Sequence, residues 1–364
     1  MATTTDQPVD LGNLGADLLP IYRLMLLTRA FDERITLLSH QGRVGIAASA
    51  RGHEAAQVAS AWAARPGQDV LYPYYRDIGV VLTVGVSPLD LFLGALNRAG
   101  EPFSGARQMP FHYTSAALRM PTPSTSIATH IPHAVGAALA AKVRGEDAVT
   151  FCWFGDGATS KGDFHEGLSF AAIHRLPIVF ICENNQYAIS VPLALQLPVA
   201  SVAQRAAGYG IPADQIDGMS VPDTYAAVRR AVARAQAGAG PSLVETLVYR
   251  LGPHTSHDDD SRYRSREEVA SWEAREPIAR LRAELQQAGQ LDDAADAALH
   301  TEVADEIAQA LATAEAAPEP DPATAFTDIL AGYTVPNPFQ RGPKRTNSAA
   351  RQSGEGIRST GTQA

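Results

Sequence analysis

Two uninterrupted apolar segments constrain the fold of this chain more than any other feature. Residues 148–154 (AVTFCWF) and 176–184 (LPIVFICEN) show no alternation of polar and apolar side chains, and helix-like sequence separates them. Strands of this kind are buried on both faces, as in a parallel sheet covered by helices. A helix-like segment at 221–238 and an apolar segment at 241–250 continue the same rhythm. The sequence therefore predicts an α/β fold with a mostly parallel sheet flanked by helices.

Periodicity and capping signals place the other elements. Apolar residues at helical spacing predict helices over 21–38 and 53–64, and Ser87 is the expected N-cap of another. Residues 254–268 are highly charged and predict a surface loop. C-terminal amphipathic helices are expected within 267–289 and 301–317.

Composition divides the chain into three parts. Residues 1–20 predict a flexible leader, residues 21–335 one large domain, and residues 336–364 a basic tail whose composition is typical of disorder. The domain is the part that can bury a large core.

Charge and hydropathy exclude several classes of protein. A formal net charge of −9 argues against a nucleic-acid partner, which would require a basic face. No apolar run reaches the roughly 18 residues of a membrane span, and the N-terminus lacks the pattern of a secretion signal. Cys152 and Cys182 both lie in apolar strand segments, which is typical of buried free thiols. We therefore expect a cytoplasmic protein.

Polar residues follow the two apolar strands at corresponding points. Gly155-Asp156-Gly157 ends the first strand, and Asn185 lies 29 residues after Asp156, just beyond the second strand. One βαβ unit can bring both ends to the edge of a parallel sheet where ligands bind. Carboxylate and amide oxygens, with a backbone carbonyl and phosphate oxygens, would complete an octahedral Mg²⁺ site. The pairing predicts a metal-bound diphosphate, whereas the glycines alone would indicate only a turn.

These motifs resemble those of a known family. GDG followed about thirty residues later by NN is similar to the thiamine-diphosphate motif. Over residues 20–335 the chain resembles the alpha subunit of the decarboxylating component of 2-oxo acid dehydrogenase complexes. The segments that carry the resemblance are YYRD, RQMPFHY, SIATHIPHAVGAALA, GDGATSKGDFHEGLSFAA, CENNQYAIS and YRLGPHTSHDDDSRYR. RQMPFHY, NNQYAIS and GPHTSHDDDSRYR are most similar to the branched-chain 2-oxo acid branch. The resemblance implies the thiamine-diphosphate-binding fold.

The resemblance also implies roles for individual residues. Asp156, Asn185 and the carbonyl of Tyr187 would hold Mg²⁺. The residues implied in binding the diphosphate are Gly157 and Ala158 through backbone N–H groups, and Tyr75, Arg76 and Arg250 through side chains. Ile127 would contact the aminopyrimidine ring through its backbone. His254, with His112 as its companion, would line the reacting centre.

Two positions depart from the family pattern. Glu183 stands where branched-chain relatives have an arginine, which puts one diphosphate contact in doubt. A K⁺ site would use Ser124, Ser126 and Thr129, but His130 replaces the amide expected there.

The implied reaction is oxidative decarboxylation of a branched-chain 2-oxo acid, with the cofactor as electron sink. The acyl group would pass to the lipoyl group of a partner acyltransferase, with His254 as a hydrogen-bond donor. No carboxylate of this chain is a convincing partner for the aminopyrimidine ring. In the family a beta subunit supplies that glutamate, so we expect a heterotetramer of two alpha and two beta chains. A pyruvate or acetoin dehydrogenase alpha subunit remains an alternative, and so does a non-catalytic scaffolding subunit.

Overall fold

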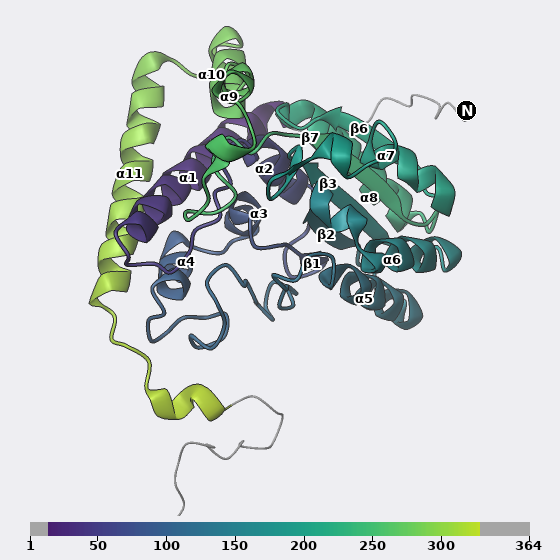
Figure 1. Cartoon of the computed structure of the whole chain (residues 1–364), viewed down its shortest axis with the longest axis horizontal. Coiled ribbons are helices and arrows are strands. Elements are labelled where there is room, and N and C mark those ends of the chain that lie inside the picture. The colour runs from purple at the N-terminus through teal and green to yellow at the C-terminus, as the bar shows by residue number, and fades with distance from the viewer. Residues whose placement is uncertain (1–13, 328–364) are drawn as a thin grey trace, which may run out of the picture. The chain divides into compact units, whose positions relative to one another are not determined.

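A computed structural model describes residues 14–327 and contains a five-stranded parallel sheet (Figure 1). The strands are β1 (Val70–Tyr72), β2 (Thr150–Gly155), β3 (Ile178–Asn184), β6 (Ala213–Asp217) and β7 (Ser242–Leu247). They lie in the order β1-β2-β3-β7-β6, and all neighbours are parallel. The predicted fold class is confirmed.

The register aligns the carboxyl ends of the three central strands. Gly155 of β2 pairs with Glu183 of β3, and Asn184 of β3 pairs with Leu247 of β7. The residues that follow these strands therefore emerge at one edge of the sheet. A separate two-stranded hairpin, β4 (Tyr187–Ala188) and β5 (Val191–Pro192), begins directly after β3.

Helices cover both faces of the sheet, which explains the continuous apolar strands. Phe151 and Trp153 point into a core formed with α1, α2 and α8, whereas Cys152 and Phe154 point into a second core formed with α5 and α6. These helices are α1 (Leu14–His40), α2 (Glu54–Trp62), α5 (His130–Arg144), α6 (Gly162–Ile173) and α8 (Val221–Gln236). Both cysteines are buried and free, as predicted.

Further helices lie elsewhere in the chain. They are α3 (Ile78–Thr83), α4 (Pro88–Ala95), α7 (Val202–Arg205), α9 (Arg266–Glu273), α10 (Pro277–Gln287), α11 (Asp293–Ala316) and the 3₁₀ segments η1 (Asp156–Ser160), η2 (Leu193–Leu195), η3 (Ala206–Tyr209) and η4 (Asp260–Arg262). Ser87 accepts a hydrogen bond from the Asp90 N–H at the start of α4, so the predicted N-cap is confirmed. A short unit begins at Asp321 and contains η5 (Pro322–Phe326).

The helical core begins earlier than expected. Helix α1 starts at Leu14, inside the segment predicted to be a flexible leader, because Leu14 is buried and Leu18 and Leu19 pack against the core. The flexible leader is therefore wrong for residues 14–20. Residues 1–13 and the predicted tail 336–364 lie outside the described residues.

The C-terminal helices also differ in detail. A proline favours the first position of a helix, and Pro277 begins α10 there, so α9 and α10 divide the 267–289 segment. Helix α11 begins at Asp293, where Asp292 accepts from the Ala295 N–H. Within residues 14–327 no helix is both long and apolar enough to cross a membrane.

Candidate active site

A cavity of about 400 Å³ opens at the carboxyl edge of the sheet. Every residue predicted for catalysis, cofactor or Mg²⁺ except His112 lines it: Tyr75, Arg76, Ile127, Asp156, Gly157, Ala158, Asn185, Tyr187, Arg250 and His254. These residues come from the ends of β2, β3 and β7 and from the loops before α3 and α5. The fold therefore gathers segments that are far apart in the sequence.

Three oxygen atoms converge where β2 and β3 end. Asp156 is fully buried, and its Oδ1 accepts a hydrogen bond from the Asn185 N–H at 3.2 Å. The side-chain oxygen of Asn185 lies 3.3 Å from this Asp156 Oδ1 and 2.9 Å from the Tyr187 carbonyl oxygen. In this orientation the Asn185 oxygen also accepts a hydrogen bond from the Tyr187 N–H at 3.3 Å.

The same atoms can satisfy one another without a cation. If the Asn185 amide turns by half a rotation, its NH₂ group donates to Tyr187 and Asp156, and its oxygen accepts from His53 Nε2 at 3.2 Å. Among residues 14–327 no cluster of three or more His, Cys, Asp or Glu side chains could hold a metal. A carboxylate, an amide and a carbonyl oxygen are the donors that Mg²⁺ prefers, so this set fits the predicted metal.

Gln196 also forms a hydrogen bond with Asp156. Its Nε2 donates to Asp156 Oδ2 at 2.9 Å and to the Val191 carbonyl at 3.0 Å. Burial raises the pKa of Asp156, and the hydrogen bond from Gln196 opposes that rise. No sequence pattern predicts this role of Gln196, because it lies in an irregular segment with no motif.

Two buried arginines line the same cavity as these oxygens. Arg76 donates to the carbonyls of Ser49 and His254, and Arg250 donates to the carbonyls of Tyr187 and Ile189. Their exposed fractions are 1% and 0%, and within residues 14–327 neither forms an ion pair with a carboxylate. Burial, with the positive charge of Arg76, lowers the pKa of Arg250. Two unpaired cations in one cavity form a binding site for an anion.

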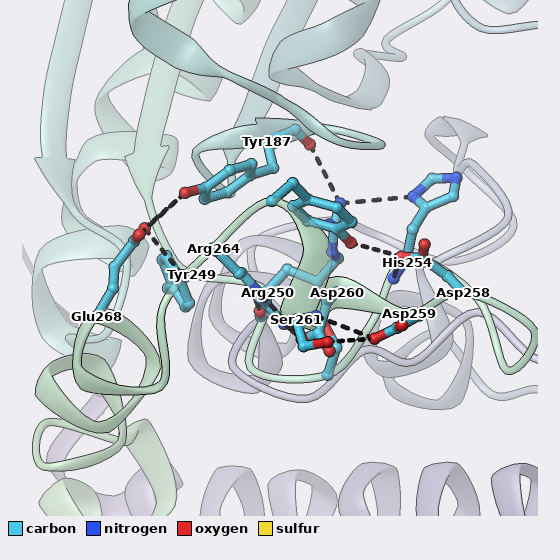
Figure 2. Close-up of polar contacts among 12 residues, drawn as sticks. Tyr187, Tyr249, Arg250, His254, Asp258, Asp259, Asp260, Ser261, Arg264 and Glu268 are labelled. Atoms are coloured by element: carbon cyan, nitrogen blue, oxygen red, sulfur yellow. Dashed lines mark hydrogen bonds and ion pairs between the residues drawn. The ribbon is translucent and has the colours of Figure 1, made fainter.

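The imidazole of His254 lies between the two guanidinium groups. Its Nδ1 is 3.5 Å from Arg250 Nη1 (Figure 2) and 3.3 Å from Arg76 Nη2. Nδ1 therefore faces donors, and the ring hydrogen belongs on Nε2. Burial, then the charges of Arg76 and Arg250, lower the pKa of His254 to about 3. A neutral imidazole with Nε2–H at the rim of the cavity can donate a hydrogen bond to a substrate.

The charged segment after His254 is more ordered than a solvated loop. Asp258 accepts from the His254 N–H at 2.9 Å and from the Tyr263 hydroxyl, and Tyr263 accepts from Arg250 (Figure 2). Arg264 is buried and donates to the carbonyls of Arg250 and Gly252. Residues 254–265 form the predicted loop, but the burial of Arg264 and the hydrogen bonds beside the cavity were not predicted from the sequence.

His112 lies apart from the other predicted residues. Its Nδ1 is 3.0 Å from the Met109 carbonyl and 3.2 Å from the Pro110 carbonyl, and its side chain does not line the cavity. The structure does not bring His112 to His254, and its catalytic role stays a prediction.

Glu183 does not reach the cavity either. It is fully buried and accepts hydrogen bonds from Gln57 Nε2 at 3.1 Å and the Tyr74 hydroxyl at 3.0 Å. Gln57 also donates to the Arg76 carbonyl, so this network supports the turn that carries Tyr75 and Arg76. Glu183 therefore stabilises the turn that carries the anion-binding residues without lining the cavity.

The fold and the cavity define an α/β protein with a cation subsite and an anion subsite at the strand ends. Residues 22–323 match the model of the family described as dehydrogenase E1 component. The chain is 42% identical over 328 residues to the 2-oxoisovalerate dehydrogenase subunit alpha of Bacillus subtilis, covering 90% of this chain and 99% of that protein. It is 43% identical over 269 residues to the 3-methyl-2-oxobutanoate dehydrogenase subunit alpha of Mycobacterium tuberculosis, covering 74% and 70%. The mitochondrial 2-oxoisovalerate dehydrogenase subunit alpha of Bos taurus is 38% identical over 312 residues, covering 85% and 68%.

The chain belongs to the dehydrogenase E1 component family, so the resemblance inferred from the motifs is confirmed. Membership implies thiamine diphosphate as cofactor and a beta subunit as partner.

Proposed function

We propose that this chain is the alpha subunit of a branched-chain 2-oxo acid dehydrogenase. With its beta subunit it catalyses oxidative decarboxylation of 2-oxo acids and transfers the acyl group to the lipoyl arm of a partner acyltransferase. The relatives named as 2-oxoisovalerate and 3-methyl-2-oxobutanoate dehydrogenase subunits support the substrate class. The observation that carries the proposal is that Asp156, Asn185 and Tyr187 line one cavity together with Arg76 and Arg250, two buried arginines with no ion pair among the described residues.

A metal-bound diphosphate is complementary to this pairing. Asp156, Asn185 and the Tyr187 carbonyl would hold Mg²⁺, and Arg76 and Arg250 would bind phosphate oxygens in the forked geometry of guanidinium groups. Tyr75, Gly157 and Ala158 line the same cavity. When bound, thiamine diphosphate supplies a carbon nucleophile and an electron sink for loss of CO₂.

The backbone before α5 completes the pocket for the organic part of the cofactor. Ile127 lines the cavity beside Ala128, which has a positive φ of 70° and is fully buried. This turn presents the Ile127 backbone toward the cavity, in agreement with its proposed contact to the aminopyrimidine ring.

His254 is proposed to act on the substrate side of the cavity. Arg76 and Arg250 hold its Nδ1, so the Nε2–H can donate to the oxygen of the bound acyl group and steady its transfer to the lipoyl arm. Bound diphosphate would offset the arginine charges that now lower the pKa of His254.

The beta subunit is needed for proton transfer at the cofactor. Asp156 is the only carboxylate among the cavity-lining residues in the described part of the chain, and it belongs to the metal set. A carboxylate for the aminopyrimidine ring must then come from another chain, which favours a cofactor site at an interface. Two alpha and two beta chains is the proposed stoichiometry, and light scattering of the purified complex tests it.

A K⁺ ion near Ser124, Ser126 and Thr129 is a further part of the proposal. Ser124 Oγ accepts from the Ser126 N–H, and the Thr129 hydroxyl donates to the Ser126 carbonyl, which orders the turn. Cofactor binding compared in K⁺ and in choline buffers tests this site. We also propose a cytoplasmic location, which the buried free thiols favour.

The decisive experiment is co-expression with the beta subunit, followed by decarboxylation assays with a dye acceptor. The substrates are 3-methyl-2-oxobutanoate, 4-methyl-2-oxopentanoate and pyruvate, each with and without thiamine diphosphate and Mg²⁺. We expect turnover of the branched acids that depends on both additions. Preference for pyruvate would identify the pyruvate-type alternative, and cofactor binding without turnover of any acid would identify the scaffolding alternative.

A further inference from the structure

His53 opens helix α2 but does not cap it. The residue stands at the N-cap position with φ −109° and ψ −5°, and its side chain makes no capping hydrogen bond. Its imidazole is fully buried, although it directly follows the irregular segment 41–52. A buried polar ring of this kind requires a specific partner.

The partner of His53 is the amide of Asn185. His53 Nε2 lies 3.2 Å from the Asn185 side chain, on the side opposite Asp156 and the Tyr187 carbonyl. The amide therefore lies between the imidazole and the two oxygens. One of its two polar atoms faces the imidazole, and the other faces the two oxygens. If the amide oxygen faces the Asp156 and Tyr187 oxygens, the NH₂ group faces the imidazole, and the reverse holds when the amide turns. The ring nitrogen must then accept from the NH₂ group or donate to the oxygen.

The two amide orientations require different hydrogens on the ring. When the Asn185 oxygen points to a cation, its NH₂ group faces His53, so Nε2 must accept and the ring hydrogen lies on Nδ1. When the NH₂ group points to Asp156 and Tyr187, the amide oxygen faces His53, so Nε2 must donate. A neutral imidazole can take either form, since its single hydrogen can occupy either nitrogen.

We propose that His53 is a positioning residue for the divalent cation, which orients the Asn185 amide and moves its ring hydrogen from Nε2 to Nδ1 when the cation binds. The inference rests on the proposed cation site of Asp156, Asn185 and Tyr187. His53 touches neither the cation nor the cofactor and acts only through Asn185. Residues that orient a metal ligand in this way typically affect metal affinity by about ten- to a hundredfold.

Mn²⁺ titration of the complex with its beta subunit, followed by electron paramagnetic resonance, tests the proposal without turnover. We expect H53F to weaken Mn²⁺ binding about tenfold, because phenylalanine keeps the ring volume but cannot accept from the amide. H53Q should stay much closer to the parent, since its own amide can accept or donate. The control H133F changes an exposed histidine of α5 outside the cavity and should leave the affinity unchanged.

A second test observes the tautomer of His53 directly in the parent protein. In ¹⁵N spectra of the histidine-labelled complex, the signal missing from H53Q belongs to His53. We expect Nε2 to carry the hydrogen without Mg²⁺ and Nδ1 to carry it with Mg²⁺, a diamagnetic ion that leaves the signal sharp. An unchanged tautomer would overturn the inference.

The outcomes separate this inference from the proposed function. Parent protein that binds no Mn²⁺ would overturn the cation site, and with it the role of His53. Parent protein that binds Mn²⁺, with H53F binding equally well, would overturn the role of His53 alone and leave the cation site in place.

Discussion

The backbone N–H of Asn185 donates to Oδ1 of Asp156, joining the ends of β3 and β2 through a functional side chain. Asp156 thus has one oxygen bound to the next strand and the other bound to Gln196. The carboxylate is held in place before any ligand arrives, which reduces the cost of ordering it on binding.

Replacing Asp156 by asparagine should abolish most divalent-cation binding. The variant keeps the size of the side chain but loses its negative charge, so we expect Mn²⁺ affinity to fall by about a hundredfold or more, equal to about 2.7 kcal/mol. Isothermal titration of the complex measures this. D163N in the first turn of α6, outside the cavity lining, is the matched control. Equal affinity in D156N and the parent would contradict the assignment.

Replacing Arg250 by lysine should weaken cofactor binding while keeping the charge. Lysine cannot reproduce the forked geometry with which Arg250 reaches the Tyr187 and Ile189 carbonyls and an anion. We expect thiamine diphosphate affinity to fall by about ten- to a hundredfold, measured by quenching of intrinsic fluorescence. R230K, in a surface ion pair with Asp214, should change nothing.

The low pKa of His254 predicts a loss of stability in acid. Its pKa in the folded protein is about 3, below the ordinary value of 6.5. As pH falls below about 6.5, the unfolded chain binds a proton that the folded chain lacks, so the free energy of unfolding falls. The slope approaches about 1.4 kcal/mol per pH unit for one such group, before allowance for its partial exposure.

H254N should therefore show a shallower fall in stability between about pH 6 and pH 4 than the parent, because asparagine does not titrate. Thermal unfolding at several pH values measures the difference. Inorganic diphosphate should also flatten the slope of the parent, because it offsets the charges of Arg76 and Arg250 and raises the pKa of His254. Parallel slopes in all three experiments would show that His254 is not the group responsible.

Gly157 should tolerate no side chain. A Cβ atom at Gly157 would lie 2.9 Å from Cβ of Ala188, so η1 and β4 would have to separate beside the proposed diphosphate site. We expect G157A to bind thiamine diphosphate at least about tenfold more weakly. G162A, where an added Cβ meets nothing within 4 Å, is the control. Unchanged affinity in G157A would mean that the hairpin moves without cost.

The sequence predicted the centre of the sheet and most of the cavity for the same physical reason. Fully apolar strands must be buried on both faces, and Asp156 and Asn185 follow them directly, so periodicity located both the strands and their ends. Strand β6 was missed because its sequence, ADQID, is polar and its residues are only partly buried at the sheet edge.

The supporting residues could not be read from the chain. His53 stands at the start of the helix predicted over 53–64, and its contact with Asn185 joins positions 132 residues apart. Gln196 lies in a segment without periodicity. Arg264 lies in the charged segment 254–268, whose composition predicted exposure to solvent. Contacts of this kind depend on tertiary packing, which leaves no local pattern in the sequence.

Gln196 provides the last test, because it binds the oxygen of Asp156 that Asn185 leaves free. Q196L removes the donor while keeping the approximate volume, and it leaves a buried carboxylate oxygen without a hydrogen bond. The loosened carboxylate should bind Mn²⁺ about three- to tenfold more weakly, a smaller loss than for D156N because the charge remains. Q215L on the partly exposed edge strand β6 is the control, and both are measured by the same titration. If Q196L bound Mn²⁺ as tightly as Q215L, the Asn185 contact alone would suffice to orient Asp156.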